Sequence, residues 1–248
     1  MTTPSHTPTP LTILTGASRG MGAAMARQCA AAGHRVLGLS RQQQAGLAAE
    51  QWAVDLSDAQ PVAERLAQWL SQIDPAAHTE VTLINNAGVI AELAPLADVP
   101  LVDTVRALRV GLEASMLLTT AFLAATRHWP VPRKVLNISS GLGRRAMAGS
   151  ASYCAAKAGM DHFSRCVALE EAGLPNGARI VSLAPGVIDT DMQVQLRGAS
   201  ASQFPDRENF VQLQTQGRLS SPEDAAARVL AWLQRPDFGQ QPAADVRD

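Results

Sequence analysis

The chain has 248 residues, of which 46% are hydrophobic, and 21 Lys and Arg against 22 Asp and Glu give a formal net charge of −1. This length suits one α/β domain with a large core. The balanced charge, without a basic block, excludes general nucleic-acid binding by charge. Cys29, Cys154 and Cys166 form no CxxC pair, and the five histidines show no metal-ligand spacing. We therefore expect free thiols, no metal site and a cytoplasmic protein.

Residues 1–10 are rich in Thr and Pro and lack the basic and apolar regions of a signal peptide, which predicts a loose N-terminal tail. The most apolar long stretch, residues 110–125, contains Glu113. It is shorter than the roughly 20 residues that span a bilayer, so no membrane contact is expected. No linker or internal repeat divides residues 11–248, which predicts a single domain.

A glycine-rich loop, Gly16-Ala17-Ser18-Arg19-Gly20-Met21-Gly22, follows a short apolar strand at 11–15 and precedes a helix that runs to about Ala32. A second strand is expected at 36–40. Strand, glycine-rich loop, helix and strand in this order are typical of dinucleotide-binding folds. Gly16 permits a tight turn, Gly20 lets the backbone approach a pyrophosphate, and Gly22 allows close helix packing. The helix N-terminus would then offer free N–H groups to phosphates.

The end of the second strand indicates which nicotinamide cofactor is bound. NAD-binding proteins usually have an acidic residue there for the ribose hydroxyls. Here Ser40-Arg41 occupy the position, and Arg19 lies within the glycine-rich loop. Two cations near the ribose suit a 2′-phosphate, so we predict NADPH. The alternative is that both arginines are merely solvated.

Two further strands are expected to end at cofactor contacts. A third strand at 52–56 places Asp55 and Leu56 where they could meet the adenine ring, and Ser57 is a candidate N-cap for a helix over 59–73. A fourth strand at 81–84 ends in Asn85-Asn86-Ala87-Gly88. The asparagine pair can brace the sheet edge, and the two small residues leave room for a flat ligand.

The second half of the chain continues the alternation of strands and helices. Residues 89–103 read as a loop, and the polar residues 193–216 read as a substrate lid without a clear pattern. A Ser N-cap and Pro at the first position open the last helix, and a short last strand can follow it. The expected elements are a long helix at 105–128, strands at 134–138 and 178–183, and a helix at 221–234.

Tyr153 and Lys157 are four residues apart in a segment with helical spacing, so they would share one helix face. The nearby cation is expected to lower the pKa of Tyr153 and make it a proton donor and acceptor. Ser140, thirteen residues upstream of Tyr153, ends the fifth strand. The three residues are a candidate carbonyl-handling triad. Taken alone, the Tyr-x-x-x-Lys spacing favours an ordinary amphipathic helix, but the cofactor motifs make a catalytic pair the preferred interpretation.

Together these motifs resemble the classical short-chain dehydrogenase/reductase family over nearly the whole chain. The resemblance implies a Rossmann-like α/β fold, with a doubly wound parallel sheet of about seven strands and helices on both faces. It implies that Ser140 binds the carbonyl oxygen and that Tyr153 is the general acid. Lys157 would hold the nicotinamide ribose, and Thr190, after Pro185-Gly186, would meet the nicotinamide carboxamide. A homodimer or homotetramer through helices 105–128 and 153–172 is also implied.

The expected cofactor contacts gather at the loops that follow the strands. The predicted set is Gly16, Ser18, Arg19, Gly20, Met21, Gly22, Ser40, Arg41, Asp55, Leu56, Asn86, Ala87, Gly88, Tyr153, Lys157, Pro185, Gly186, Ile188 and Thr190.

A finer resemblance lies in residues 153–158, 168–171 and 185–193, which look like those of sepiapterin reductases and the similar benzil reductases. It implies NADPH-dependent reduction of a pterin side chain or an aromatic 1,2-diketone. Ser140, Tyr153 and Asp245 would contact the substrate; Asp245 matches the acidic C-terminal residue that anchors pterin, or is a carboxylate on a disordered tail. The alternatives are a general carbonyl or hydroxysteroid-type reductase and a non-catalytic NADP-binding sensor.

One position departs from the family pattern. The family usually has an Asn in the middle of the long helix, where it kinks the helix and holds a water that relays protons to the lysine; here Gly111 stands there. Gly within a helix costs about 1 kcal/mol relative to Ala, which indicates a local reason for it. Gly111 could keep the kink with a second water in place of the amide, or it could weaken the relay. We expect activity to survive.

Overall fold

The computed structural model describes residues 7–248; the first six residues of the predicted tail lie outside this range. Seven parallel strands form one sheet in the order β3-β2-β1-β4-β5-β6-β7. This confirms the doubly wound α/β fold. The first strand begins at Thr9, inside the predicted tail. The strands are β1 (Thr9–Thr15), β2 (Arg35–Ser40), β3 (Glu50–Ala53), β4 (His78–Asn85), β5 (Arg133–Ile138), β6 (Arg179–Ala184) and β7 (Ala243–Asp245).

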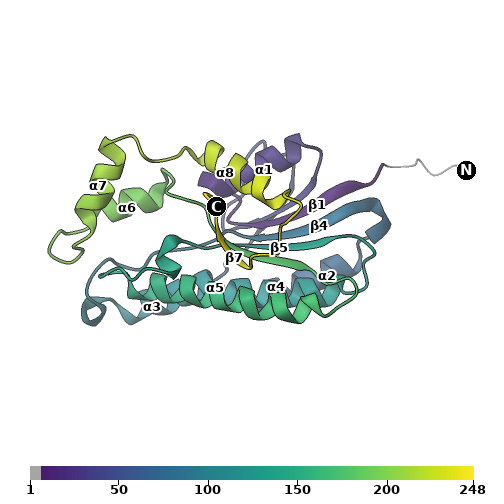
Figure 1. Cartoon of the computed structure of the whole chain (residues 1–248), viewed down its shortest axis with the longest axis horizontal. Coiled ribbons are helices and arrows are strands. Elements are labelled where there is room, and N and C mark those ends of the chain that lie inside the picture. Colours follow the sequence, from purple (N-terminus) through teal and green to yellow (C-terminus); the bar gives the residue numbers. More distant parts are fainter. Residues whose placement is uncertain (1–6) are drawn as a thin grey trace, which may run out of the picture.

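Helices cover both faces of the sheet (Figure 1). On one face α1 packs against α8, and on the other α2 packs against α4, with α5 beside β6. The helices are α1 (Gly20–Ala31), α2 (Ala59–Ser71), α3 (Leu101–Leu108), α4 (Ala114–Thr126), α5 (Ala151–Ala172), α6 (Asp191–Gly198), α7 (Arg207–Thr215) and α8 (Pro222–Leu233). Short 3₁₀ turns lie at η1 (Pro75–Ala77), η2 (Leu96–Asp98) and η4 (Gly141–Gly143), and a π-helical turn at η3 (Arg109–Glu113).

Two hydrophobic cores hold the helices to the sheet. Alternate residues of β1 point to opposite faces, so Ile13 packs with Leu66 and Phe122 on one side, while Leu14 packs with Val229 on the other. All five side chains are fully buried. Burying each large side chain stabilises the fold by about 1.5–3 kcal/mol relative to leaving it exposed. The two cores fix the strand ends at which the candidate site is built.

The region after β3 differs from the prediction. The strand ends at Ala53, three residues early, because the chain turns where the Asp55 carboxylate accepts a hydrogen bond from the Ser57 N–H at 2.9 Å. The N-cap of α2 is Asp58, without a side-chain capping bond, so the prediction of Ser57 as N-cap is wrong. Asp55 and Leu56 therefore lie in a loop beyond the strand.

The predicted single helix at 105–128 is two helices joined by a π turn. Helix α3 starts at Leu101, and the turn Arg109–Glu113 contains Gly111 at its centre. The apolar residues 110–125 are part of a longer helical run, Leu101–Thr126, which spans 26 residues and contains an 18-residue window with a mean hydropathy of 1.4. By length and composition this run could cross a bilayer, so the expectation of a stretch too short to do so is wrong. Length and composition do not separate a membrane span from a core helix, and the side of α4 that bears Leu118 and Phe122 packs into the core.

The predicted lid contains ordered helices rather than a patternless loop. Helices α6 and α7 project beyond one end of the sheet, at the left of Figure 1. A third apolar cluster anchors them, with Leu196, Phe204 and Phe210 of the lid packed on Leu93 and Met147. The last elements agree with the prediction. The Ser221 hydroxyl caps α8 by accepting a hydrogen bond from the Asp224 N–H at 3.0 Å, and β7 is the edge strand beside β6.

Candidate active site

The glycine-rich loop binds tightly to the neighbouring strand ends. Gly16 has a φ of +71° and donates its N–H to Leu39 O at 2.8 Å. A Cβ on Gly22 would lie 2.1 Å from the Gly16 carbonyl oxygen, and one on Gly16 would lie 2.8 Å from Nδ2 of Asn86. Glycine is therefore required at both positions, as the sequence predicted for a tight turn and a close helix approach.

Thr15 and Asn86 fasten this loop to the end of β4. The Thr15 hydroxyl accepts hydrogen bonds from the N–H groups of Asn86 at 2.9 Å and Ala87 at 3.0 Å. The Asn86 amide donates in return to Thr15 O at 2.9 Å. The neighbouring Asn85 donates to Asn137 of β5 at 2.8 Å. The asparagine pair braces the sheet edge, as predicted.

The start of α1 suits an anionic ligand. Its N-cap, Arg19, has extended backbone and makes no side-chain capping bond, and the first turn carries no acidic residue. The first N–H groups of a helix lack intrahelical partners and carry its positive dipole end. A Cβ on Gly20 would lie 3.5 Å from Thr190, so the loop also reaches the strand-end segment after β6. These residues fit the pyrophosphate of a dinucleotide.

The two predicted arginines have different surroundings. Arg41 is exposed just beyond β2, where the Ser40 hydroxyl donates to Gln42 O at 2.7 Å. Arg19 reaches across the strand ends and pairs with Asp191, the first residue of α6, at 2.5 Å. Both partners of this ion pair are well exposed, with 68% and 74% of their side chains accessible. The glycine-rich loop is thus tied to the start of α6.

Ser140, Tyr153 and Lys157 come together at the end of β5. Ser140 follows the strand, and its hydroxyl accepts the Leu142 N–H at 3.2 Å. Tyr153 and Lys157 lie on the first turns of α5, with 8% and 3% of their surfaces exposed. The Lys157 ammonium donates to Ile138 O at 2.6 Å. It lies 5.7 Å from the centre of the Tyr153 ring, and a Cβ on Gly88 would be 3.8 Å from it.

Burial dominates the ionisation of this pair. It raises the pKa of Tyr153 to about 12, against a lowering by the Ser140 hydroxyl as a hydrogen-bond partner. It lowers the pKa of Lys157 to about 8, while the nearby Asp161 carboxylate acts in the opposite direction. The prediction that Lys157 lowers the pKa of Tyr153 is wrong for this structure, because the pKa of the phenol is raised and the ammonium donates to Ile138 instead.

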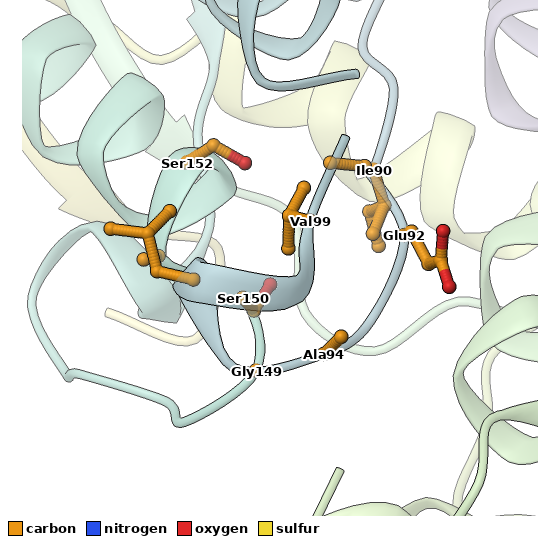
Figure 2. A pocket seen from close by; sticks show the side chains of 10 residues that line it. Ile90, Glu92, Ala94, Val99, Gly149, Ser150 and Ser152 are labelled. Carbon is orange, nitrogen blue, oxygen red and sulfur yellow. The ribbon is translucent and has the colours of Figure 1, made fainter. Parts of the chain in front are cut away.

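An apolar cluster that includes residues of the predicted lid packs beside this region. Cys154 and Leu142, close in sequence to Tyr153 and Ser140, pack on the lid cluster. Beside it, between the loop that starts at Ile90 and the start of α5, lies a small pocket (Figure 2). It has room for about one water molecule. The Ser150 hydroxyl, a buried atom that lines it, has no hydrogen-bond partner within residues 7–248. This pocket is too small for a ketone substrate.

Asp245 lies at the same sheet edge. It pairs with Ala184 in the β6–β7 register, next to Pro185 and Gly186, so the alternative of a disordered tail is wrong. Its carboxylate accepts two hydrogen bonds from the Arg247 guanidinium, at 2.7 and 2.6 Å, and these hold the pKa of Asp245 below its usual range.

The remaining predicted contacts follow β6. Gly186 has a φ of +85°, Ile188 forms an isolated parallel bridge with Ser220, and Thr190 is the N-cap of α6. Two residues of this region were not predicted from the sequence: Arg247, which pairs with Asp245, and Asp161, which lies one helical turn after Lys157. The i, i+4 spacing from Lys157 to Asp161 was the available signal.

Comparison with known proteins agrees with this geometry. The sequence model of the short chain dehydrogenase family matches residues 11–201. The chain belongs to the short-chain dehydrogenase/reductase family. It is 34% identical over 237 residues to benzil reductase ((S)-benzoin forming) of Bacillus cereus, covering 92% of this chain and 95% of that one. It is 32% identical over 258 residues to sepiapterin reductase of Rattus norvegicus, covering 95% of each.

A solved structure supports the same family. A metagenomic short-chain oxidoreductase in complex with NADP has a TM-score of 0.67 and 27% identity, with 95% of this chain and 94% of that chain covered. The short-chain oxidoreductase expected from the motifs is therefore confirmed, both in fold and in enzyme class.

Proposed function

We propose that this short-chain reductase uses NADPH to reduce a ketone, preferably an aromatic 1,2-diketone. The observation that carries the proposal is the convergence of Ser140, Tyr153 and Lys157 at the carboxyl end of β5, next to the glycine-rich loop. Ligands of open α/β sheets bind beyond these strand ends. The site therefore combines a cofactor cradle with hydroxyl donors suited to a carbonyl oxygen.

Ser140, Tyr153 and Lys157 have different proposed roles in the reduction. A bound NADPH would supply the hydride to the carbonyl carbon. Ser140 and Tyr153 hold the carbonyl oxygen, and their O–H groups stabilise the negative charge that develops on it. Tyr153 gives its proton to that oxygen. A phenol whose pKa is near 12 is protonated at neutral pH, so it starts as the proton donor that reduction needs. Lys157 is fixed by Ile138 O and would hold the nicotinamide ribose.

NADPH is proposed over NADH because the cation Arg41 stands directly after β2, where NAD-binding proteins usually have a carboxylate. Arg19 is the N-cap residue of α1, the helix that would receive the pyrophosphate, and is the second proposed cation. The related metagenomic oxidoreductase was solved with NADP. The other proposed contacts are the set of cofactor residues predicted from the sequence. Catalytic efficiency with NADH equal to or above that with NADPH would contradict this choice.

An aromatic diketone is proposed because the lid is apolar where it covers the site. Phe204, Met147 and Cys154 belong to one cluster beside Tyr153. Two relatives are a benzil reductase and a sepiapterin reductase, and these names favour a substrate with adjacent carbonyl groups or a pterin. The proposed pterin anchor, Asp245, is already held by Arg247 and would have to exchange partners. A general carbonyl or hydroxysteroid-type reductase and a non-catalytic NADP sensor are the alternatives.

We also propose a cytoplasmic homodimer or homotetramer. All three cysteines are free thiols, which fits a reducing compartment. Helix α3 exposes Leu101, Val102 and Val105, with 85%, 71% and 46% of their surfaces accessible, and α4 exposes Met116. Pairing of this apolar stripe between copies of the chain would remove it from water. The mass of the protein in solution, measured by light scattering, tests this assembly.

A substrate panel tests the function. NADPH oxidation is measured with benzil, sepiapterin and a steroid ketone, in single-turnover and steady-state experiments. We expect benzil to be the best substrate and Tyr153→Phe to abolish reduction while NADPH binding is retained. Retention of most activity by Tyr153→Phe would refute the assignment of the acid. NADPH binding without oxidation by any ketone would favour the sensor.

A further inference from the structure

Asp161 is a buried carboxylate to which the proposed mechanism gives no role. It lies on α5 one turn after Lys157, and 2% of its surface is exposed. Oδ1 accepts hydrogen bonds from the hydroxyls of Ser139 at 2.6 Å and Ser182 at 2.7 Å. Oδ2 accepts from Nε of Arg144 at 3.1 Å. An isolated buried carboxylate is costly, so this set of donors is what makes it tolerable.

These contacts join the catalytic helix to three strands. Ser139 directly precedes Ser140 at the end of β5, and Ser182 lies on β6. Nη2 of Arg144 donates a hydrogen bond to Ala244 O of β7 at 2.9 Å. Asp161 therefore lies at the point where β5, β6 and, through Arg144, β7 are tied to α5.

The turn that carries Ser140 rests directly on this helix. A Cβ on Gly143 would lie 2.9 Å from the Lys157 carbonyl oxygen and 3.2 Å from Oδ2 of Asp161. There is no space for a side chain between the turn and α5. Asp161 bonds to Ser139 and Arg144, the residues on the two sides of this turn, and so ties both ends of the turn to α5.

Asp161 is also the charge that favours a protonated Lys157. Burial lowers the pKa of Lys157, and the Asp161 carboxylate raises it. Of the other groups near Lys157, Tyr153 is uncharged at neutral pH, and Ile138 and Gly88 contribute no side-chain charge. The Arg144 cation opposes Asp161 from the outer side of its carboxylate, where 35% of its side chain is exposed.

We propose that Asp161 is a positioning residue for carbonyl reduction: it keeps Lys157 in its ammonium form and holds the Ser140 turn against α5. This inference rests on the proposed function of the site. Asp161 touches neither the expected substrate nor the expected cofactor, so it acts through Lys157 and Ser139.

The test is the pH profile of kcat for Asp161→Asn, which keeps the side-chain shape and one acceptor oxygen but removes the charge. We expect the loss of activity at alkaline pH to move to lower pH by about one unit, equal to a tenfold change in the protonation equilibrium of Lys157. KM should change less than kcat. Ser182→Ala is the matched control, since it removes one hydrogen bond and keeps the carboxylate, and its alkaline limb should stay in place. A uniform loss of rate in Asp161→Asn, with an unmoved limb, would overturn the proposal.

A second variant tests the same idea from the opposite direction. Arg144→Met removes the cation that pairs with the Asp161 carboxylate and offsets its charge near Lys157. The loss of kcat at alkaline pH should therefore move to higher pH in this variant. This variant decides the question if Asp161→Asn fails to fold in a thermal-unfolding assay: an unmoved or lower limb overturns the proposal.

NADPH binding separates this inference from the proposed function. The NADPH dissociation constant, measured by cofactor fluorescence against pH, needs no ketone. We expect Asp161→Asn to lose affinity at a lower pH than the wild type. A wild type that reduces no ketone counts against the proposed function, whereas identical binding profiles for the two proteins count against Asp161.

Discussion

The ammonium of Lys157 lies 5.7 Å from the centre of the Tyr153 ring and donates to the carbonyl oxygen of Ile138 at 2.6 Å. The four-residue spacing brings the two side chains to one face of α5, but the hydrogen bond that Lys157 donates goes to the end of β5. The phenol thus remains in a buried environment that disfavours its charged form.

Tyr153 is the only tyrosine of the chain, so its ionisation can be measured directly. We expect the phenolate absorbance of the cofactor-free protein to rise with a midpoint near pH 12, above the ordinary value of 10.0, because burial penalises the phenolate. Tyr153→Phe provides the blank and should show no phenolate band. A midpoint below 10 would restore the expectation, based on the sequence, that Lys157 lowers the pKa of Tyr153.

Lys157→Met should abolish reduction and yet stabilise the protein at neutral pH. The folded chain holds Lys157 with a pKa of about 8 against an ordinary value of 10.5, so burying the ammonium is unfavourable. After allowance for the lost bond to Ile138, we expect the free energy of unfolding at pH 7 to rise by about 2 kcal/mol.

The pH dependence of this gain has a definite sign. Between pH 8 and 10.5 the unfolded chain keeps the Lys157 proton and the folded chain has lost it, so wild-type stability rises with pH. Lys157→Met lacks this increase, and its advantage should shrink from pH 7 to pH 10. Thermal unfolding of both proteins across this range measures the difference, and a constant difference would contradict the assigned cause.

The sheet and the position of the site could be predicted because they depend on local pattern. Apolar runs bounded by glycine, asparagine or proline marked β1, β2, β4, β5 and β6, and Gly16 and Gly22 occupy positions that exclude any side chain. Strand ends were less predictable. Ser57 looked like an N-cap, but its N–H bonds to Asp55 two residues earlier, a choice between local hydrogen bonds that sequence does not resolve.

The electrostatics of the site could not be predicted, because they arise from residues distant in sequence. The raised pKa of Tyr153 comes from burial of its side chain, which exists only in the folded chain. The pairing of Arg19 with Asp191 joins positions 172 residues apart. The lid helices were missed for a related reason: their apolar residues are few, and they pack on Leu93 and Met147 from other parts of the chain.

Asp191→Asn should strengthen NADPH binding. In the structure the Asp191 carboxylate forms an ion pair with Arg19, which we propose as a 2′-phosphate contact. Exposed ion pairs contribute about 0.2–1 kcal/mol, so freeing Arg19 should lower the NADPH dissociation constant by at most about fivefold at low salt and leave that of NADH unchanged.

Asp189→Asn is the matched control for this substitution. It removes the same charge two residues away, from a carboxylate that lies 3.7 Å from Arg197 rather than Arg19. Fluorescence titration with both cofactors compares the variants. Equal tightening by the two substitutions would mean a general effect of charge and would count against a specific role of Arg19.

Gly111 allows the π turn to lie close to the catalytic helix. A Cβ there would be 3.2 Å from Cβ of Ala156, the residue before Lys157, and both atoms are fixed to the backbone. Gly111→Ala must therefore separate the two helices by a few tenths of an ångström. We expect kcat to fall severalfold through displacement of Lys157. Stability should change by less than about 1 kcal/mol, because the better helix propensity of Ala offsets the contact.

Gly159→Ala and Gly111→Asn separate two possible effects at this interface, a steric displacement of α5 and a change in the proton relay to Lys157. A Cβ on Gly159 would lie 2.8 Å from the flexible end of Leu112, which can rotate away, so this control should keep most of its activity. Gly111→Asn adds the amide that the family usually has. Because a π turn already interrupts the α-helix at Gly111 without the amide, we expect the Asn variant to be no faster than Gly111→Ala. An Asn variant faster than the wild type, with a changed pH dependence of kcat, would show instead that Gly111 weakens the proton relay to Lys157.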